Sequence, residues 1–301
     1  MTQTAIHDDL VAVIRDFTAH ELVPRTAALD AADRDVIDDV WRQLTGLNLD
    51  RALLAEDLGG VGLDLDDFLG VLEELAFGEA GTALAVLLNN AALGALPAAV
   101  ARDLPDGSRW TVALAFESRG RLPAVLGAVG ADGVVVATGT PEPALFALPA
   151  TALTGQPDSR QLGLRAAGSA DLSFDPAGVP GTAGSDTAAA VSRTRALVHA
   201  GLAVISRGIA RRAHQIARDY AHTRIQGGVP IVTYGAVRDM LAEMTVRLRS
   251  TDPLGVAAHD PATTLAQKIA ASDAAMATTL DAVQVLGGIG YMVDTGAEKL
   301  M

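Results

Sequence analysis

The sequence of 301 residues has no cysteine, few aromatic residues and an excess of acidic over basic residues. Without cysteine the chain can form no disulfide, thiolate metal site or cysteine nucleophile. The six histidines show no ligand-like spacing, so we expect no metal site. Aromatic residues make up only 4% of the chain, which leaves few large anchoring side chains. The net charge of -13 repels phosphate groups, and we therefore expect no nucleic acid partner.

The sequence also shows neither a signal peptide nor a membrane span. Charged residues interrupt the apolar residues of positions 8–15, unlike the basic start and unbroken apolar run of a signal peptide. A cytoplasmic location is therefore the default expectation. The longest apolar stretch begins at Ala83, and Asn89, Asn90 and Pro97 interrupt it. This pattern favours a buried helix over a membrane span, and we expect no membrane partner.

The residues that are present favour a globular fold with a large core. Hydrophobic residues make up 50% of the chain and charged residues only 20%, a balance typical of folded proteins. In residues 8–103 apolar side chains recur at three- and four-residue steps, which predicts helices. Asp64 follows a glycine-rich loop and is placed to cap the next helix. These features predict an N-terminal helical domain over residues 1–106.

The middle of the chain has a different pattern. Between Trp110 and Pro180 four short apolar or β-branched runs, TVALAF, GVVVAT, ALFALPA and ADLSF, are separated by glycine, proline and aspartate. Such punctuation predicts short strands joined by turns. We therefore expect a small β domain over residues 107–184.

Helical periodicity returns in the last part of the chain. The predicted helices run from an N-cap at Asp186 to about Arg224, from Pro230 to about Arg249, and from Pro261 to Leu286. Three long antiparallel helices form a bundle, so residues 185–301 are predicted to be a C-terminal helical bundle domain. The predicted fold class is mainly α with a small β middle unit.

Two motifs lie in this C-terminal part. Residues 224–231 read Arg-Ile-Gln-Gly-Gly-Val-Pro-Ile, and residues 282–291 read Ala-Val-Gln-Val-Leu-Gly-Gly-Ile-Gly-Tyr. Taken singly, an arginine can complement the dipole at a helix C-terminus and a glycine can end a helix. Together, at this spacing, the motifs resemble those of the acyl-CoA dehydrogenase family. The order helical, small β, helical extends the resemblance across nearly the whole chain.

The resemblance implies FAD bound between subunits and the α,β-dehydrogenation of an acyl-CoA thioester. In the family the motif arginine, here Arg224, contacts the FAD pyrophosphate of a neighbouring subunit, a task that suits a planar guanidinium. Gln284 and the glycine pair Gly287 and Gly288 are implied to contact the same FAD, because a residue without Cβ lets the backbone approach the cofactor. Gly227 replaces the phenylalanine of the family motif, which removes an aromatic surface for the nucleotide.

The chain departs from the family where a subunit holds its own flavin. The family loop Thr-Glu-Pro-Gly-x-Gly-Ser-Asp corresponds to residues 115–121, Ala-Phe-Glu-Ser-Arg-Gly-Arg, and the Trp-Ile-Thr/Ser strand has no counterpart. The catalytic glutamate lies in a Tyr-Glu-Gly-Thr segment in many members, and the chain stops at Met301 before that segment. In other members the base lies on the first long C-terminal helix, at the position of Val198. Valine cannot accept a proton, so we expect no catalytic residue in this chain.

These departures suggest a degenerate, non-catalytic subunit of a bacterial heteromeric acyl-CoA dehydrogenase. Such a subunit would complete the FAD site of a larger homologous partner, which would supply the catalytic glutamate, on a bulky acyl-CoA of the steroid-derived kind. The alternatives are a stand-alone protein of this fold with flavin-independent chemistry, and a protein that binds CoA esters without turnover.

Some titratable residues are weaker candidates for catalysis or CoA binding. Four glutamates could in principle act as bases: Glu73, Glu74, Glu79 and Glu117. We expect Glu73 and Glu74 to face solvent. His199 has a near-neutral reference pKa that suits a general base, but a lone histidine on a long helix more often packs or faces solvent. Three arginines could contact a CoA phosphate, although a solvated helix face or an acidic partner surface is favoured: Arg207, Arg211 and Arg212.

Overall fold

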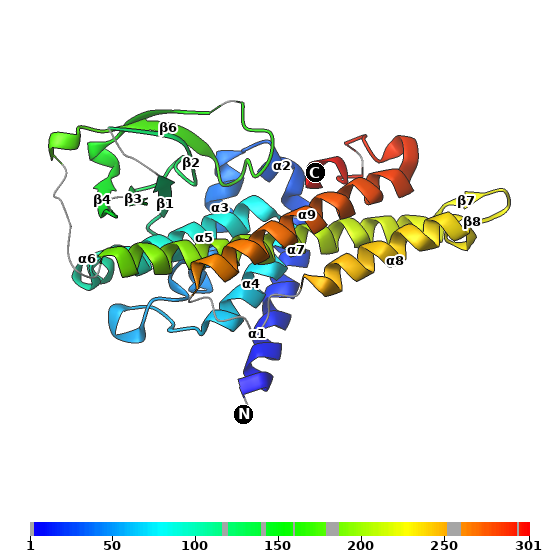
Figure 1. The fold of residues 1–301 in the computed structure, drawn as a ribbon, viewed down its shortest axis with the longest axis horizontal. Helices are drawn as coiled ribbons and strands as arrows, with labels where there is room; N and C mark the ends of the chain where they lie inside the picture. The colour runs from blue at the N-terminus through cyan, green and yellow to red at the C-terminus, as the bar shows by residue number, and fades with distance from the viewer. Residues whose placement is uncertain are drawn as a thin grey trace.

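The computed structural model describes residues 3–115, 120–139, 143–158, 160–178, 187–251, 260–293 and 295–301. Helices form the first part of the chain (Figure 1). Their bounds are α1 Gln3–Phe17, α2 Thr26–Asp30, α3 Arg34–Gly46, α4 Leu65–Gly78, α5 Ala80–Ala95 and α6 Ala98–Asp103. Asp64 caps α4 as predicted, because its carboxylate accepts a hydrogen bond from the Asp67 N–H at 2.9 Å.

Most of the apolar stretch from Ala83 lies in α5, which is buried along most of its length, and Pro97 follows the end of that helix. The expectation of a buried helix is therefore confirmed. No helix of the described residues is both long and apolar enough to cross a membrane. The two asparagines that interrupt the stretch are buried too: the Asn89 amide donates to the Asp50 carbonyl at 2.8 Å, and the Asn90 amide donates to the Leu49 carbonyl at 2.8 Å. They tie the loop before α4 to the core.

The middle of the chain forms two three-stranded sheets over one end of the helices (Figure 1). The strands are β1 Trp110–Ala115, β2 Arg121–Leu126, β3 Gly133–Thr138, β4 Leu145–Pro149, β5 Thr154–Pro157 and β6 Ser169–Ser173. One sheet has the order β1-β3-β4, with β1 and β3 parallel, and the other has the antiparallel order β2-β6-β5. The four predicted runs are β1, β3, β4 and β6. Strands β2 and β5 were missed, since their prolines and lack of alternation hide them.

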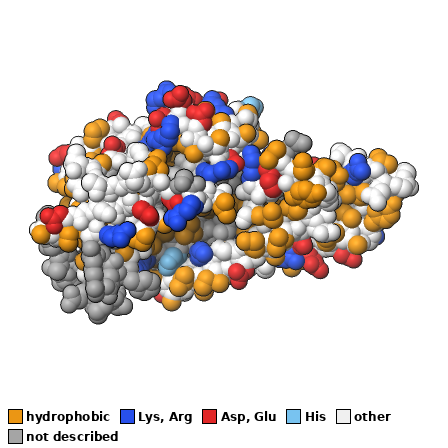
Figure 2. All heavy atoms as spheres, turned by 90° about the horizontal axis from the view of Figure 1, so that it is seen from above, with side chains coloured by type: hydrophobic (Ala, Val, Ile, Leu, Met, Phe, Trp, Pro, Cys, Tyr) orange, Lys and Arg blue, Asp and Glu red, His pale blue; other side chains and the backbone are white. Residues whose placement is uncertain are grey.

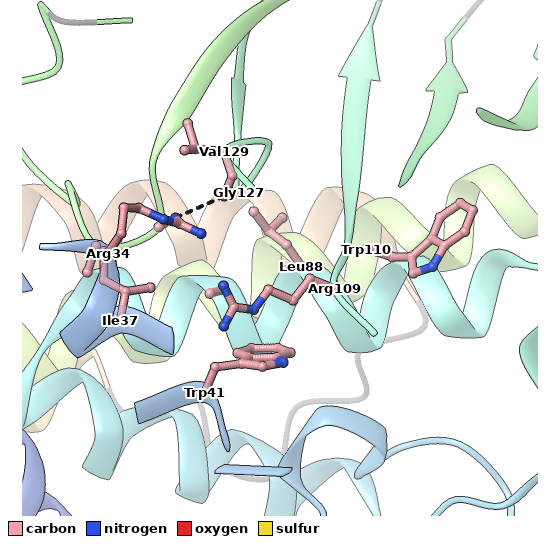
Figure 3. Close-up of a pocket in the computed structure, with 11 residues that line it drawn as sticks. Arg34, Ile37, Trp41, Leu88, Arg109, Trp110, Gly127 and Val129 are labelled. Atoms are coloured by element: carbon pink, nitrogen blue, oxygen red, sulfur yellow. Dashed lines mark hydrogen bonds between the residues drawn. The ribbon is translucent and has the colours of Figure 1, made fainter. Parts of the chain in front are cut away.

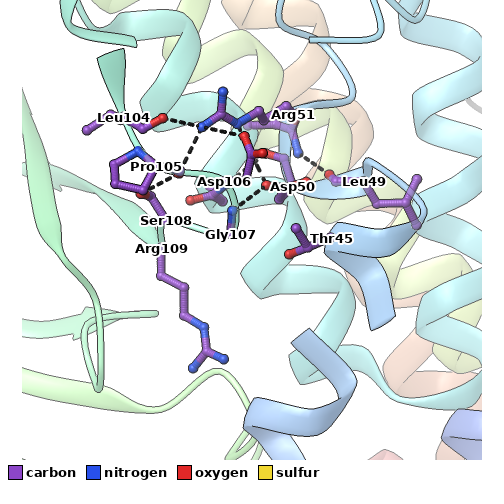
Figure 4. Close-up of polar contacts among 12 residues, drawn as sticks. Thr45, Leu49, Asp50, Arg51, Leu104, Pro105, Asp106, Gly107, Ser108 and Arg109 are labelled. Carbon is purple, nitrogen blue, oxygen red and sulfur yellow. Dashed lines mark hydrogen bonds and ion pairs between the residues drawn. The ribbon is translucent and has the colours of Figure 1, made fainter. Parts of the chain in front are cut away.

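A network of hydrogen bonds fixes the linker between the helices and β1 (Figure 4). The Arg51 Nη2 donates to the carbonyls of Leu104 at 2.6 Å and Pro105 at 2.8 Å, and the Asp50 carboxylate accepts from the Gly107 N–H at 3.1 Å. Burial raises the pKa of Asp50, against the lowering effect of the Gly107 hydrogen bond. This network fixes the linker just before β1, and the Trp110 N–H at the start of β1 donates to the Asn89 side chain of α5 at 2.6 Å.

The last part of the chain is a bundle of α7 Thr187–Thr223, α8 Gly235–Ser250 and α9 Pro261–Leu286. The third helix has the predicted bounds, whereas Asp186, the predicted cap of α7, lies outside the described residues. The second helix begins at Gly235 rather than after Pro230, because a hairpin of β7 Ile225–Gln226 and β8 Val229–Pro230 comes first. The hairpin lies at the opposite end of the bundle from β1–β4 (Figure 1).

Candidate functional site

A groove of about 700 Å³ gathers the residues of both C-terminal motifs. It lies where α7 ends, where α9 ends and where the β7–β8 hairpin begins. The described lining residues are Tyr220, Arg224, Gln226, Ile231, Tyr234, Val237, Gln284, Val285, Leu286, Gly287, Gly288 and Ile289. All four residues predicted to contact a cofactor are therefore in one depression, although they come from segments about sixty positions apart in the sequence. The volume lies within the usual range for a site that takes a small molecule or cofactor, roughly 300 to 1,000 Å³.

The hairpin positions Arg224 at the edge of this groove. The Arg224 N–H continues the helical pattern by donating to the Tyr220 carbonyl at 2.8 Å, and its own carbonyl accepts from the Ile231 N–H at 2.9 Å. Gly227 and Gly228 both have positive φ, 60° and 83°, as a two-residue type I′ turn requires. The Arg224 side chain is exposed. Its guanidinium is thus available to an anion that enters the groove.

The glycines after α9 have different structural reasons. An added Cβ at Gly290 would lie 2.6 Å from the Val283 carbonyl oxygen, so the fold itself requires glycine there. Gly287 has a φ of 64°, which favours glycine as a helix stop. Gly288 has neither constraint, because its φ is not positive and an added Cβ would meet no atom within 4 Å. The described part of the fold therefore gives no steric or conformational reason for glycine at 288.

A second cavity, of about 420 Å³, lies between α5, α7, β1 and β2. Its described lining residues are all apolar: Leu84, Leu88, Val112, Ala113, Leu114, Ala115, Leu122, Pro123, Ala124, Val125, Leu126, Val198 and Leu202. Val198, at the predicted base position, is 4% exposed and is one of these lining residues. None of the described lining residues carries an acid or a base.

The groove and the apolar cavity lie at opposite ends of the molecule. Val198 and Thr223 are on the same helix, α7. A helix rises 1.5 Å per residue, so these residues are roughly 37 Å apart along the axis of α7. The groove of one chain therefore cannot cover the apolar cavity of the same chain.

Comparison with known proteins identifies the family. The acyl-CoA dehydrogenase N-terminal domain matches residues 4–101, and the acyl-CoA dehydrogenase C-terminal domain matches residues 190–301. The chain belongs to the acyl-CoA dehydrogenase family. The mitochondrial short-chain specific acyl-CoA dehydrogenase of Bos taurus is 28% identical over 351 residues, which covers 97% of this chain and 83% of the relative.

Solved structures confirm the acyl-CoA dehydrogenase fold. Butyryl-CoA dehydrogenase from Megasphaera elsdenii superposes with a TM-score of 0.83 at 21% identity, covering 100% of this chain and 93% of that chain. A variant of the Tcur3481-Tcur3483 steroid ACAD superposes with a TM-score of 0.80 at 24% identity, covering 99% and 92%. Members of the family generally bind FAD. In this acyl-CoA dehydrogenase fold, the residues predicted to contact the cofactor line one groove, and the Arg224 side chain there is exposed.

Two of the weaker candidates are part of the core of this family member. Glu73 and Glu74 on α4 are only 7% and 4% exposed, so the expectation that they face solvent was wrong. Their partners are arginines of α7: Arg207 Nε donates to Glu73 at 3.1 Å, and Arg211 donates to Glu73 at 3.0 Å and to Glu74 at 3.1 Å. The expectation of a solvated arginine face was therefore also wrong, because these arginines neutralise buried carboxylates. The Arg212 guanidinium lies over the Phe77 ring at 5.4 Å.

The remaining candidates lie outside both depressions or outside the described residues. Glu79 caps α5 by accepting from the Gly81 and Thr82 N–H groups, and burial raises its pKa. His199 is half-buried; burial lowers its pKa, and its Nδ1 has no hydrogen-bond partner in the described part of the chain. It is not among the described lining residues of either the groove or the cavity. Glu117 lies outside the described residues.

A third depression, beside the linker to β1, is too small for a cofactor (Figure 3). Its volume is about 40 Å³, enough only for a few waters. The Arg109 guanidinium lies over the Trp41 ring at 5.2 Å, and Arg34 donates to the Val129 carbonyl at 3.2 Å. These contacts explain the depression as packing between α3 and the β sheets.

Proposed function

We propose that this chain is a non-catalytic subunit of a heteromeric, FAD-dependent acyl-CoA dehydrogenase. It would complete the FAD site of a larger homologous subunit, and that partner would supply the catalytic glutamate. The main support for the proposal is that one chain has both a groove with the predicted cofactor residues and a cavity without a base. The groove gathers Arg224, Gln284, Gly287 and Gly288, whereas the distant cavity has Val198 at the expected position of a base.

The groove residues offer the contacts that a dinucleotide needs. The fork of Arg224 can donate to two phosphate oxygens, and a hydrogen bond to a charged group contributes about 1.5 to 3 kcal/mol. The Gln284 amide can donate and accept at a sugar or ring edge. The bare Cα of Gly288 lets the cofactor lie against the backbone. These groove residues lie at the other end of the molecule from this chain's own apolar cavity, so they would serve a neighbour.

The apolar cavity supports the second half of the proposal. When bound, FAD supplies the acceptor for the hydride that leaves the β-carbon in this family. Removal of the α-proton needs a positioned base, and the described lining of this cavity has only apolar side chains. Val198 and its neighbours can exclude water or pack against an apolar group, but they cannot take a proton. The base would therefore come from the partner.

The surface around the groove is apolar enough for a subunit contact. Figure 2 shows hydrophobic side chains gathered at the end of the molecule that carries the hairpin and the end of α9. The exposed hydrophobic residues there are Ile225, Val229, Ile289, Tyr291, Met292 and Val293, with Val293 73% exposed. Contiguous exposed apolar surface commonly marks an interaction site. A partner seated here would cover both this surface and the groove.

For the substrate we propose a bulky acyl-CoA of the steroid-derived class. One relative in fold is described as a steroid ACAD. At 24% identity that likeness shows the fold alone. The substrate class is therefore a part of the proposal to be tested by assaying the complex with bulky acyl-CoA esters.

The test is to purify the chain alone and with a homologous acyl-CoA dehydrogenase encoded by the same genome. We expect the chain alone to carry no FAD and the complex to carry flavin at the shared interface. Arg224→Ala in the complex should weaken FAD binding by about 1.5 to 3 kcal/mol, as measured by flavin retention and titration. Arg249→Ala, at an exposed arginine at the end of α8, is the matched control and should leave FAD binding unchanged.

Two results would overturn the proposal. One is stoichiometric flavin in the chain purified alone, which would show a complete site in a single kind of subunit. The other is a stable, flavin-free homo-oligomer that binds a CoA ester and no homologous subunit, which would favour a CoA-ester-binding protein.

A further inference from the structure

Arg195 is a partly buried arginine that has no partner in the described part of the chain. It lies near the start of α7, where that helix packs against β3 and β4 (Figure 1). Its Nε is shielded from solvent and makes no hydrogen bond to a described residue, and the guanidinium forms no ion pair with a described carboxylate. Arg51 and Arg207, by contrast, each have a carboxylate partner. An unpaired donor that is shielded from water costs free energy, so Arg195 is a candidate for binding an anion.

Arg195 lies at one end of the apolar cavity. Val198 and Leu202, which line the cavity, follow on the same face of α7. The guanidinium lies against Gly139, just after β3, because an added Cβ there would be 3.0 Å from the Arg195 Nη2. The Gly139 N–H donates to the carbonyl of Ala115, another lining residue, at 3.1 Å. Side chains on a helix lean towards its N-terminus, so the guanidinium lies beyond Val198, where β1 ends.

The surroundings of Arg195 are positively charged although the chain is acidic. Burial lowers the pKa of His199, and the positive charges of Arg195 and Lys268 lower it further. Lys268 on α9 also forms no ion pair with a carboxylate of the described ranges. The chain has 36 acidic and 23 basic residues, so two neighbouring cations without acidic partners are not expected from its composition. Together they create a local positive potential that attracts a small anion.

We propose that the apolar cavity binds a free amphipathic carboxylic acid, with the apolar part of the acid between α5, α7, β1 and β2 and its carboxylate on the Arg195 guanidinium. This inference goes beyond the proposed function and needs neither a partner subunit nor FAD. The cavity of about 420 Å³ has an apolar described lining that suits a hydrocarbon body, and the planar guanidinium matches a carboxylate.

The charges favour a carboxylate over other head groups. The net charge of -13 opposes a phosphate dianion more strongly than a group with one negative charge. A thioester carbonyl has no charge, so an acyl thioester in the cavity would leave Arg195 without a counter-ion. A free acid supplies both the apolar body and the single charge.

The test uses the full chain and decanoate, with binding measured by calorimetric titration. Arg195→Met should weaken decanoate binding at least about tenfold, because one charge-assisted hydrogen bond is lost. Decanol has the same chain without the charge, and it should bind more weakly than decanoate and equally to both proteins. Arg193→Met is the matched control, since Arg193 is exposed on the same helix, and it should leave decanoate binding unchanged. The melting temperature of Arg195→Met should not fall, because the substitution removes an unpaired charge.

Val198→Phe tests whether the apolar part enters the cavity. The larger side chain fills part of the space and should weaken binding of decanoate and decanol alike, in a variant whose melting temperature shows that it is folded. If folded Val198→Phe binds both as the unchanged chain does, or if Arg195→Met keeps full decanoate affinity, the proposal is wrong. Absence of decanoate binding at millimolar concentration also overturns it. If decanoyl-CoA binds more tightly than decanoate and loses affinity in Arg195→Met, Arg195 binds a CoA phosphate and the free-acid site is wrong.

Discussion

The Arg211 guanidinium on α7 lies 3.0 Å from the Glu73 carboxylate on α4. It also reaches Glu74 at 3.1 Å, and Arg15 on α1 lies 3.0 Å from the same Glu74. The carboxylate side chains are only 10% and 5% exposed. The network therefore joins helices of the N-terminal part to the C-terminal bundle through ion pairs whose carboxylates have little access to water.

Arg211→Met should destabilise the chain by about 1.5 to 3 kcal/mol, the contribution of a hydrogen bond to a charged group. After the substitution Glu73 keeps Arg207 and Glu74 keeps Arg15, so neither buried carboxylate is left without a cation. The measurement is denaturant unfolding at neutral pH. Arg218→Met is the control: Arg218 and Asp219 are 51% and 56% exposed, and such surface pairs contribute about 0 to 1 kcal/mol. Equal effects of the two substitutions would show that the network does not stabilise the helix contact.

His199 should make stability depend on pH without contributing to catalysis. Burial, with smaller contributions from Arg195 and Lys268, lowers its pKa from 6.5. A histidine with a lowered folded pKa contributes stability above its unfolded pKa, and that stability is lost as pH falls towards the folded pKa. The unchanged chain should therefore lose more stability than His199→Gln when unfolding is measured at falling pH below 6.5. Parallel pH profiles would show that the imidazole titrates as freely in the folded chain as in the unfolded chain.

The same variant tests the absence of a base in this chain. In the complex, His199→Gln should keep turnover per bound flavin within a few fold, whereas loss of a true general base lowers the rate by about a hundredfold or more. The partner's catalytic glutamate, changed to glutamine, should abolish turnover and is the positive control. If His199→Gln abolished turnover with flavin and assembly intact, this chain would supply a catalytic group.

Local sequence signals predicted the elements that local forces determine. Asp64 caps its helix, and α9 runs from Pro261 to Leu286, because capping and periodicity act over a few residues. The burial of Glu73 could not be predicted in this way, since its arginine partners come from a helix more than a hundred residues later. From the sequence alone, a glutamate at that position is expected to face solvent, because the local pattern does not show its tertiary partners.

The same limit applies to the groove. The motifs predicted its residues one by one, and the structure places Arg224 and Gln284 together. Tyr234 was not predicted to line the groove, because its position there depends on the hairpin turn that brings its hydroxyl to the Gln226 carbonyl. The pair Gly227-Gly228 is a hairpin signal in the sequence. It does not indicate which side chain packs over the turn.

Val198→Glu should show how apolar the second cavity is. Its neighbours in the described lining, Leu84, Leu88 and Leu202 among them, offer a carboxylate no hydrogen bond from a side chain. Burial should raise the folded pKa of the new glutamate above its unfolded value. A raised folded pKa means that stability present at low pH is lost as pH rises through it, by about 4 kcal/mol for a three-unit shift.

The measurement for this variant is the free energy of unfolding over a range of pH, with Val198→Gln as the neutral control. The glutamine variant should lose a constant amount of stability, and the glutamate variant should lose more as pH rises. A pH-independent loss for Val198→Glu would mean that the carboxylate reaches water or a cation, and the cavity would not be the dry, base-free site inferred above.

Gly288→Ala should lower flavin retention in the complex without changing the stability of the chain. An added Cβ at this position meets no atom within 4 Å, and its φ is not positive, so substitution should change the melting temperature little. Gly290→Ala is the contrasting variant, because its Cβ would lie 2.6 Å from the Val283 carbonyl oxygen and should destabilise the chain by about 1 to 3 kcal/mol through backbone displacement. If Gly288→Ala retained flavin fully while Arg224→Ala lost it, the cofactor would contact the arginine but not approach the backbone after α9. If Gly288→Ala unfolded the chain, position 288 would have a structural reason for glycine that the fold does not show.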